Sequence, residues 1–490
     1  MHVPPGALYT AAQVRELDRR AIEDLGIPGY ELMTRAGHAT LNALRALWPA
    51  ARSVAVLCGP GNNGGDGYVV ARVARAQGLR ARVVSTVDPA QLRGDARRAY
   101  DDYAAAGGRL EPWSPSVLQA DVIVDALFGT GLARALDEPA SGMLAAANAC
   151  ARPIVAVDLP SGLHADTGAV LGVAVRAVLT VSFIGRKVGC YLGEGPDYAG
   201  RRVFDDLAVP AEVYAGVEPV ARLLDEPDVA AALPRRLRAS HKGDHGHVLV
   251  VGGGPGMPGA ARLAGEAALR AGAGLVTVAV HPDNAGSVAA RPELMCVPAR
   301  DAAALEPAFA RATVLAVGPG LGRSEWARAL FEAALASGRP AVLDADALNL
   351  LAQSPRRRDD WVLTPHPGEA ARLLGCGTAE VQRDRLGAAR ELQSRYGGTV
   401  VLKGAGSLVQ APHGPPRLCD RGNPGMASAG MGDVLTGVIA GIAGQCGDLA
   451  LAAGAAVFVH AQAGDLAARR GERGLVAGDV IEQLRACVNP

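Results

Sequence analysis

Lysine and aromatic residues are scarce in this 490-residue chain. Only three of its 49 basic residues are lysines, namely Lys187, Lys242 and Lys403. All the other basic residues are arginines. A lysine that persists in such a composition is expected where arginine cannot replace its compact ammonium group, or else it is a leftover without a special role. Aromatic residues make up 4% of the chain, which argues against stacking platforms for bases. The formal net charge of zero gives no overall attraction to nucleic acid or to an anionic membrane.

Paired cysteines and long apolar runs are also missing. The eight cysteines are scattered and form no Cys-x-x-Cys pair, which is typical of reduced thiols in the cytosol. The N-terminal stretch MHVPPGALYT lacks the basic and apolar regions of a signal peptide. The most apolar tract, residues 434–444, is too short to cross a bilayer. We therefore predict a cytoplasmic protein that binds neither membrane nor nucleic acid.

Two parts of the chain alternate short β-branched runs with helical stretches. The first runs from residue 53 to about 207, and the second begins at residue 247. Such alternation predicts parallel sheets that are covered by helices on both faces. Between them, residues 208–240 contain several prolines and no strand-like run. The predicted fold class is α/β with two domains: a Rossmann-like three-layer sandwich over residues 1–215 and a second α/β domain over residues 225–490.

The glycine-rich segment GPGNNGGDG, residues 59–67, fits the G-x-G-x-x-G fingerprint of dinucleotide-binding proteins. Asp66, however, sits where a pyrophosphate would have to approach, and no motif supports a hydride acceptor, which argues against a dehydrogenase. Asn62, Asn63 and Asp66 bring amide and carboxylate oxygens into this segment. These oxygens suit a hard cation or the hydroxyl groups of a sugar.

Two further strand ends in the first half carry polar side chains. Asp125 closes the run VIVD, and Asp158 closes IVAVD with Ser161 just after it. The carboxyl ends of parallel strands meet at one edge of a sheet, where ligands bind. The pattern therefore predicts one polar site built from three strand ends.

These motifs resemble the NAD(P)H-hydrate epimerase domain. The segments GNNGGDG, DALFGTGL and DLPSGL carry the resemblance, together with ELDRRAIEDLGIPGYELMTRAG, over about residues 8–210. The resemblance implies a K⁺ ion held by Asn63, Asp125 and Ser161, and it places Lys187 near the site as a catalytic candidate. It also implies a set of residues that bind the hydrated nucleotide: Asn62, Asn63, Gly64, Gly65, Asp66, Gly129, Thr130, Gly131, Leu132, Ala133, Arg134, Ala135 and Asp158.

Epimerisation at C6 of a hydrated nicotinamide ring requires hydroxide to leave and to return on the opposite face. A carboxylate can move the proton and stabilise the cationic ring between these steps. We assign both roles to Asp158 as a hypothesis.

In the second half, GNPGMASAGMGDVLTGVIAG places a glycine turn and Asp433 at the start of an apolar helix. Backbone N–H groups at such a helix start bind anions, and Asp433 could accept a proton from a hydroxyl during phosphoryl transfer. The segment VVLKGAGSLV adds Lys403 and a tight turn suited to nucleotide phosphates. His366 stands at a strand end in TPHPGEAARLL, where a ligand contact is favoured.

The second half resembles the ADP/ATP-dependent NAD(P)H-hydrate dehydratases, which have a ribokinase-like fold. The match covers about residues 230–485 and includes HKGDHGHVLVVGG, GPGLG, VLDADALNLL, LTPHPGEAARLL, VVLKGAG and GNPGMASAGMGDVLTG. Met431 departs from the family pattern, which commonly has Ser at that position. The resemblance implies that the hydrate is bound by Ala260, Gly320, His366 and Asp433. It implies that the nucleotide is bound by Lys403, Gly404, Ala405, Gly406, Ser407 and Gly432.

Together the two resemblances predict a bifunctional repair enzyme for hydrated NADH and NADPH. It would interconvert the R and S hydrates and dehydrate the S form with ADP and Mg²⁺, releasing AMP and phosphate. The layout of two fused domains resembles bacterial members and favours ADP, although the residues themselves leave ADP and ATP both open. Two alternatives are a small-molecule kinase with an accessory domain and a non-catalytic N-terminal binding module. The resemblance also favours a homo-oligomer.

Overall fold

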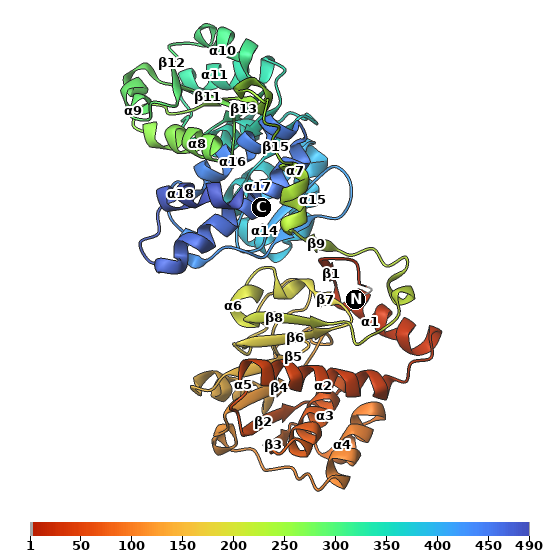
Figure 1. The fold of residues 1–490 in the computed structure, drawn as a ribbon. Helices are drawn as coiled ribbons and strands as arrows, with labels where there is room; N and C mark the ends of the chain where they lie inside the picture. Colours follow the sequence, from red (N-terminus) through yellow and green to blue (C-terminus); the bar gives the residue numbers. More distant parts are fainter. Residues whose placement is uncertain (1–2, 490) are drawn as a thin grey trace. The chain divides into compact units, whose positions relative to one another are not determined.

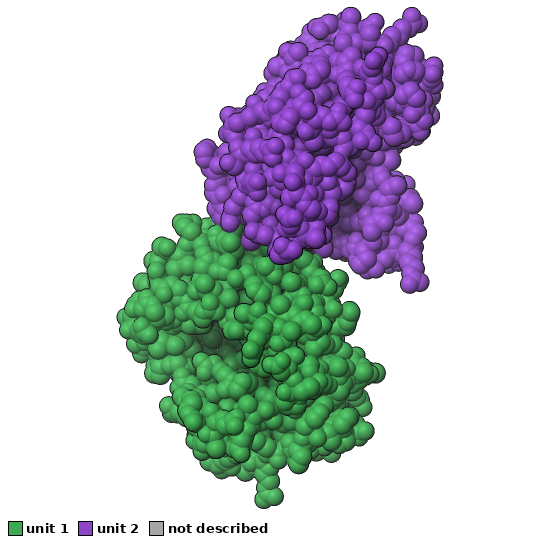
Figure 2. Space-filling model, turned by 180° about the vertical axis from the view of Figure 1, so that it is seen from behind, with its two compact units in different colours: residues 1–222 green, residues 223–490 purple. Residues whose placement is uncertain are grey.

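The computed structural model describes residues 3–489. The chain folds into two compact units, and the boundary between them falls between Arg222 and Leu223 (Figure 2). This boundary lies within residues 216–224, the segment that separates the two predicted domain ranges. Each unit has its own sheet and its own hydrophobic core, so each is described separately.

The N-terminal unit is built on a parallel sheet, as the alternating runs predict. Its strand order is β3-β2-β4-β5-β6-β8 (Figure 1). The register pairs Leu57 with Asp125 and Asp125 with Ala156, so the carboxyl ends of the central strands lie together. The strands are β2 (Ser53–Cys58), β3 (Arg80–Ser85), β4 (Val122–Ala126), β5 (Ile154–Val157), β6 (Leu179–Phe183) and β8 (Arg201–Asp205).

Helices cover both faces of this sheet and complete three layers. One core joins the sheet to α2, α3 and α4, and a second core on the opposite face joins it to α5. The helices are α1 (Ala11–Arg19), α2 (Gly29–Leu47), α3 (Asn62–Ala76), α4 (Gly94–Ala105), α5 (Ala140–Ala149) and α6 (Gly195–Ala199). The short strand β1 (Ala7–Tyr9) pairs in parallel with β7 (Arg186–Lys187), and its Ala7 and Leu8 pair antiparallel with Arg222 and Ala221 in β9 (Ala221–Leu223).

Part of the expected glycine-rich loop is helical. Helix α3 begins at Asn62, so Asn62 to Asp66 form its first turns. The glycines explain why a helix fits here. A Cβ atom on Gly67 would lie 2.7 Å from the Ala126 Cβ, and one on Gly65 would lie 2.6 Å from Met33. Glycine lets α3 approach the strands and α2 more closely than any side chain would allow.

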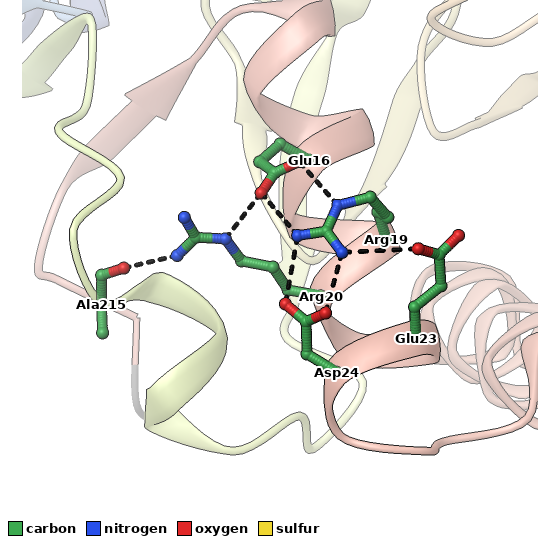
Figure 3. A network of polar contacts seen from close by, with 6 residues as sticks. All are labelled: Glu16, Arg19, Arg20, Glu23, Asp24 and Ala215. Atoms are coloured by element: carbon green, nitrogen blue, oxygen red, sulfur yellow. Dashed lines mark hydrogen bonds and ion pairs between the residues drawn. The ribbon is translucent and has the colours of Figure 1, made fainter.

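Helix α1 is followed by one turn of π-helix, Arg20–Asp24. A network of ion pairs joins these elements (Figure 3). Arg19 contacts Glu16 at 2.9 Å and Asp24 at 2.8 Å, while Arg20 contacts Glu16 at 2.8 Å and also donates to the backbone of Ala215. The capping box of Thr10 and Gln13 closes the other end of α1. These contacts fix the helix that carries Asp18.

The C-terminal unit has a larger sheet, with the order β12-β11-β10-β13-β14-β15-β16-β17-β18. Its pairs are parallel from β12 to β16 and antiparallel from β16 to β18. The strands are β10 (His247–Val251), β11 (Leu275–Val280), β12 (Met295–Pro298), β13 (Val314–Val317), β14 (Ala341–Leu343), β15 (Trp361–Leu363), β16 (Thr399–Leu402), β17 (Ser407–Gln410) and β18 (Arg417–Cys419).

Apolar helices pack on one face of this sheet around α16, and helices such as α11 and α15, which contact the strands but contribute nothing to that core, cover the other. The helices are α7 (Glu226–Ala232), α8 (Pro258–Arg270), α9 (Ala285–Ala289), α10 (Glu306–Arg311), α11 (Glu325–Ala336), α12 (Asp346–Gln353), α13 (Pro367–Leu374), α14 (Thr378–Arg383), α15 (Arg385–Tyr396), α16 (Met431–Cys446), α17 (Leu449–Ala467) and α18 (Ala477–Cys487).

Within the described residues, the helical run Leu449–Arg470 is long and apolar enough to cross a membrane. About two thirds of its most apolar window (67%) is buried inside the structure, where α17 packs against α16 and α18. Core helices pass the same length and composition test, so this run is explained by its place in the core.

Candidate active sites

The N-terminal unit contains a cavity of about 470 Å³ beside the carboxyl edge of its sheet. Helix α1, the start of α3, the segment after β4 and the ends of β5 and β6 supply its walls. The charged side chains on these walls are Arg15, Asp18, Asp66, Asp95, Asp158 and Lys187. Of the predicted strand-end groups Asp125, Asp158 and Ser161, Asp158 lines this cavity, whose volume suits a small ligand.

Asp158 and Lys187 form an ion pair in this cavity, although they are 29 residues apart. Lys187 is 1% exposed, and its ammonium also donates to the Phe183 carbonyl at 3.0 Å. Asp158 has a φ of 68°, a left-handed backbone conformation that is strained for aspartate. The Phe183 N–H donates to Asp158 Oδ1 at 3.3 Å. A strained residue in a buried charge pair is typical of a functional site.

Two other carboxyl groups share the cavity. The pKa of Asp18 is raised to about 7, mainly by burial; Lys187 opposes the rise, and the charge of Asp158 adds to it. Burial also raises the pKa of Asp66 well above its usual value, with Asp158 and Asp18 adding to the effect. The sequence-based prediction missed Asp18. The available signal was a charged residue four positions after Val14, on the buried face of α1.

Asp125 and Ser161 lie beneath the cavity and are fully buried. Asp125 accepts hydrogen bonds from the Ser161 N–H at 2.8 Å and the Ser161 hydroxyl at 2.7 Å. Burial raises the pKa of Asp125 to about 6, and these hydrogen bonds oppose the rise. The amide of Asn63 is also buried, and neither its oxygen nor its nitrogen has a partner. An unpartnered amide oxygen, a carboxylate and a hydroxyl form a donor set that fits K⁺.

The structure brings most of the predicted epimerase residues to this cavity. Asn62, Asn63, Asp66, residues 129–132 and Asp158 line it. Gly64 and Gly65 are buried behind the wall, where they allow α3 to pack closely. The loop residues 133–135 lie elsewhere: they are exposed and do not line the cavity.

In the C-terminal unit, Lys403 lies at the end of β16 and contacts two carboxylates. Its Nζ is 2.6 Å from Asp344 Oδ1 and 3.8 Å from Glu369 Oε2. Burial alone would lower the pKa of Lys403, but Asp344 and Glu369 outweigh it and the pKa is raised. Asp344 is 1% exposed, and its other oxygen accepts a hydrogen bond from Thr436 at 2.8 Å. Asp344 therefore joins β14, β16 and α16.

His366 begins α13 as its N-cap, and its ring accepts from the Gly368 N–H at 3.0 Å. Its Nε2 lies 3.5 Å from Glu369 Oε1. Burial raises the pKa of Glu369 to about 7. The ring of His366 stays half exposed, with 51% of its side chain accessible, so it can contact a ligand while Glu369 and Lys403 stand behind it.

Asp433 lies in the first turn of α16, next to Met431 and Gly432. Gly430, at the N-cap, has a φ of 87° and turns the chain into the helix. Burial raises the pKa of Asp433 to about 7, Asp344 adds to this, and Lys403 opposes it. A Cβ on Gly432 would lie 3.3 Å from Lys403 Nζ, so this helix start faces the lysine. Met431 is buried, which leaves its backbone N–H as the group suited to an anion.

The predicted nucleotide turn, Lys403 to Ser407, connects β16 and β17. Gly404 and Ala405 are exposed, and the Ser407 hydroxyl donates to the Gly404 carbonyl at 2.9 Å. Arg385 lies below this turn and is 4% exposed. Its guanidinium donates to carbonyls of Leu402, Lys403 and Gly406 at 3.3–3.4 Å.

Ala260 and Gly320 lie close together in the same unit, since a Cβ on Gly320 would be 3.0 Å from the Ala260 Cβ. The Gly322 N–H donates to Asp346 at 2.8 Å, which ties this segment to the start of α12. The motif VLDADALNLL was part of the sequence resemblance, but no role was predicted for Asp344 or Asp346. The signal for Asp344 was the one used in the first domain, an aspartate directly after a buried strand.

The family described as NAD(P)H-hydrate dehydratase matches residues 248–485, and the family described as YjeF-related protein N-terminus matches residues 29–189. A crystal structure of a ribokinase-like superfamily protein from Enterococcus faecalis is 30% identical. It superposes with a TM-score of 0.51 and covers 55% of this chain and 95% of its own. The chain is thus a two-domain α/β enzyme with a ribokinase-like C-terminal domain.

Two relatives cover nearly the whole chain. A bifunctional NAD(P)H-hydrate repair enzyme from Coxiella burnetii is 48% identical over 486 residues, which is 99% of both chains. The enzyme of the same name from Escherichia coli is 45% identical over 492 residues, covering 99% of this chain and 95% of its own. The chain belongs to the family of bifunctional NAD(P)H-hydrate repair enzymes.

Proposed function

We propose that this enzyme repairs hydrated NADH and NADPH at two separate sites. The N-terminal unit interconverts the R and S hydrates, and the C-terminal unit dehydrates the S form. One observation supports this assignment: a single chain of this family contains two buried lysine–aspartate pairs. One pair, Asp158 and Lys187, lies in the cavity of the N-terminal unit, and the other, Asp344 and Lys403, lies beside the base-like Asp433.

In the N-terminal site, the hydrate is bound by Asn62, Asn63, Asp66 and the segment after β4. Asp158 stabilises the cationic ring that forms when the hydroxyl group leaves C6, and Lys187 keeps Asp158 in place. We propose that Asn63, Asp125 and Ser161 hold a K⁺ ion. When bound, this ion would supply positive charge that helps to bind the substrate. The unpartnered Asn63 amide supports this assignment.

In the C-terminal site, the terminal phosphoryl group of the nucleotide is transferred to the C6 hydroxyl oxygen of the hydrate, and Asp433 accepts the proton of that hydroxyl. Phosphorylation turns a poor leaving group into a good one. The phosphate then leaves with the help of the ring nitrogen lone pair, and loss of a C5 proton restores the dihydronicotinamide. The N–H groups at the start of α16 and the ammonium of Lys403 stabilise the charge of the phosphoryl group. His366, Ala260 and Gly320 bind the hydrate.

We propose ADP as the phosphoryl donor, with AMP and phosphate as products and Mg²⁺ bound to the nucleotide phosphates. The exposed backbone of the turn from Lys403 to Ser407, together with Gly432, supports a phosphate contact here. Asp344 keeps the ammonium of Lys403 at the base of the turn.

The test supplies the purified full-length protein with a mixture of both hydrate epimers, ADP and Mg²⁺. We expect complete recovery of the dihydronicotinamide absorbance together with stoichiometric release of AMP and phosphate. A stable phosphorylated product would indicate a small-molecule kinase instead. Recovery of only half the absorbance would mean that the N-terminal unit does not epimerise, and no recovery would refute the proposal.

A further inference from the structure

Six charged side chains line one cavity in the N-terminal unit, and four of them come from four different elements. Asp18 comes from α1, Asp66 from α3, Asp158 follows β5, and Lys187 belongs to β7. These four supply three carboxyl groups and one ammonium group, and the other two charged side chains of the cavity are Arg15 and Asp95. Since Lys187 is paired with Asp158, the carboxyl groups of Asp18 and Asp66 lack a cationic partner of their own among the described residues.

The contacts of Asp158 hold it as a fixed charge. Its Oδ1 receives both the Lys187 ammonium and the Phe183 N–H, and its carbonyl receives the Ser182 hydroxyl at 2.6 Å. Its Oδ2 faces Gly129, where an added Cβ would lie 3.4 Å away. Such a group is well placed to stabilise a cation. Proton transfer requires a different environment, because a carboxyl group that exchanges protons with a substrate must be free to change its hydrogen-bond partners.

Asp18 has that environment. Among the described residues its side chain takes part in no hydrogen bond and no ion pair. Burial raises its pKa to about 7, so both of its protonation states are populated near neutral pH. The charged and titratable groups around it are Arg15 on its own helix, Asp66, Asp95, Asp158, Lys187 and Tyr214.

We propose that Asp18 is the catalytic proton donor and acceptor of the epimerisation, and that Asp158 with Lys187 supplies the fixed charge. This inference rests on the function proposed for the N-terminal unit. The Asp18 proton passes to the C6 hydroxyl, the carbon–oxygen bond breaks, and water leaves as the ring nitrogen lone pair forms a C=N bond. Another water adds to the opposite face, and its surplus proton returns to the Asp18 carboxylate. No proton or electron is consumed overall.

The outer surface of the same helical segment provides a matched control. Glu23 belongs to the ion-pair network of Figure 3, its side chain is 66% exposed, and it does not line the cavity. Glu23→Gln removes one carboxylate, as Asp18→Asn does, but without touching the cavity wall. The dehydratase activity of the same chain on purified S hydrate reports whether each variant is folded.

The experiment measures the rate of R-to-S conversion across pH for wild type, Asp18→Asn, Asp18→Glu and Glu23→Gln. We expect Asp18→Asn to lose about 100-fold or more in epimerisation. Asp18→Glu should recover part of that loss, because it restores a carboxyl group, and Glu23→Gln should match wild type. The wild-type kcat/KM should fall as pH rises above about 7, where the donor loses its proton, and this limb should be missing in Asp18→Asn.

The outcomes separate this inference from the proposed function. A wild-type enzyme that does not epimerise would refute the function of the unit. An active wild type with an equally active Asp18→Asn variant would overturn the inference alone. An Asp18→Asn variant that loses activity but keeps the wild-type pH limb would assign Asp18 a structural role and would also overturn it. Equal losses in Asp18→Asn and Asp18→Glu would do the same.

Discussion

The three lysines show how much a single residue type can reveal. Lys187 and Lys403 are each paired with an aspartate in a different unit, and both lie in the candidate sites. Lys242 is exposed. The Lys187 ammonium lies between the Asp158 carboxylate and the Phe183 carbonyl, and the Lys403 ammonium contacts the carboxylates of Asp344 and Glu369. Both places suit a compact ammonium better than the wider, forked guanidinium of arginine. Two of the three lysines that the sequence singled out therefore lie in candidate sites.

Asp433 gives a prediction at the same scale. Its raised pKa, about 7, means that the free enzyme gains the required base as pH rises through neutrality. The dehydratase kcat/KM should therefore increase between about pH 6 and 8 and then level off. Asp433→Asn should lower it by about 100-fold or more and leave epimerisation unchanged. Rates on purified S hydrate check both statements, and a flat wild-type profile would contradict the assignment of Asp433 as the base.

At the scale of elements, the start of α3 depends on glycines that allow close backbone contact. A Cβ on Gly64 would lie 2.0 Å from the Gly59 carbonyl oxygen, whereas a Cβ on Gly61 would have nothing within 4 Å. We expect Gly64→Ala to destabilise the N-terminal unit by about 1–3 kcal/mol through overpacking and to impair epimerisation. Gly61→Ala should keep the wild-type unfolding midpoint. Urea unfolding of both variants tests this, and equal midpoints would contradict it.

The turn between β16 and β17 depends on an element that lies beneath it. Arg385, at the start of α15, donates hydrogen bonds to three backbone carbonyls of this region. Burial lowers the pKa of Arg385 to about 10. Arg385→Met leaves these carbonyls without their donor. We expect the KM for ADP to rise by about tenfold, with a smaller change in the affinity for the hydrate. The exposed Arg383, two residues earlier, is the matched control, and Arg383→Met should leave the KM for ADP unchanged.

At the scale of the whole molecule, each unit contains a candidate site of its own. Because the S hydrate is a free small molecule, the two activities need not be on the same chain. Full-length Asp158→Asn should rapidly convert only the S half of an epimer mixture, and full-length Asp433→Asn should convert none. A mixture of the two variants should restore complete conversion. If the mixture recovers no more absorbance than Asp158→Asn alone, the two sites are not independent.

Much of the fold could be predicted because short-range patterns carry it. Continuous β-branched runs such as VIVDA predict buried parallel strands, and aspartates after these runs predict a ligand edge. The start of α3 was harder to place. Glycine and asparagine have low helix propensity, so the sequence favours a loop. Packing against Met33 and the strands outweighs that propensity in the folded chain.

The sequence by itself determined the two α/β domains and the family, and it predicted candidate site residues whose motifs stand next to strand ends. Those features depend on residues that are close together along the chain. Only the tertiary structure decided that Asp18 lines the same cavity as Asp158 and Lys187, that Asp344 pairs with Lys403, and that Arg385 supports the turn between β16 and β17. These groups come from positions up to about 170 residues apart along the chain, and their charges interact strongly only because folding removes them from water.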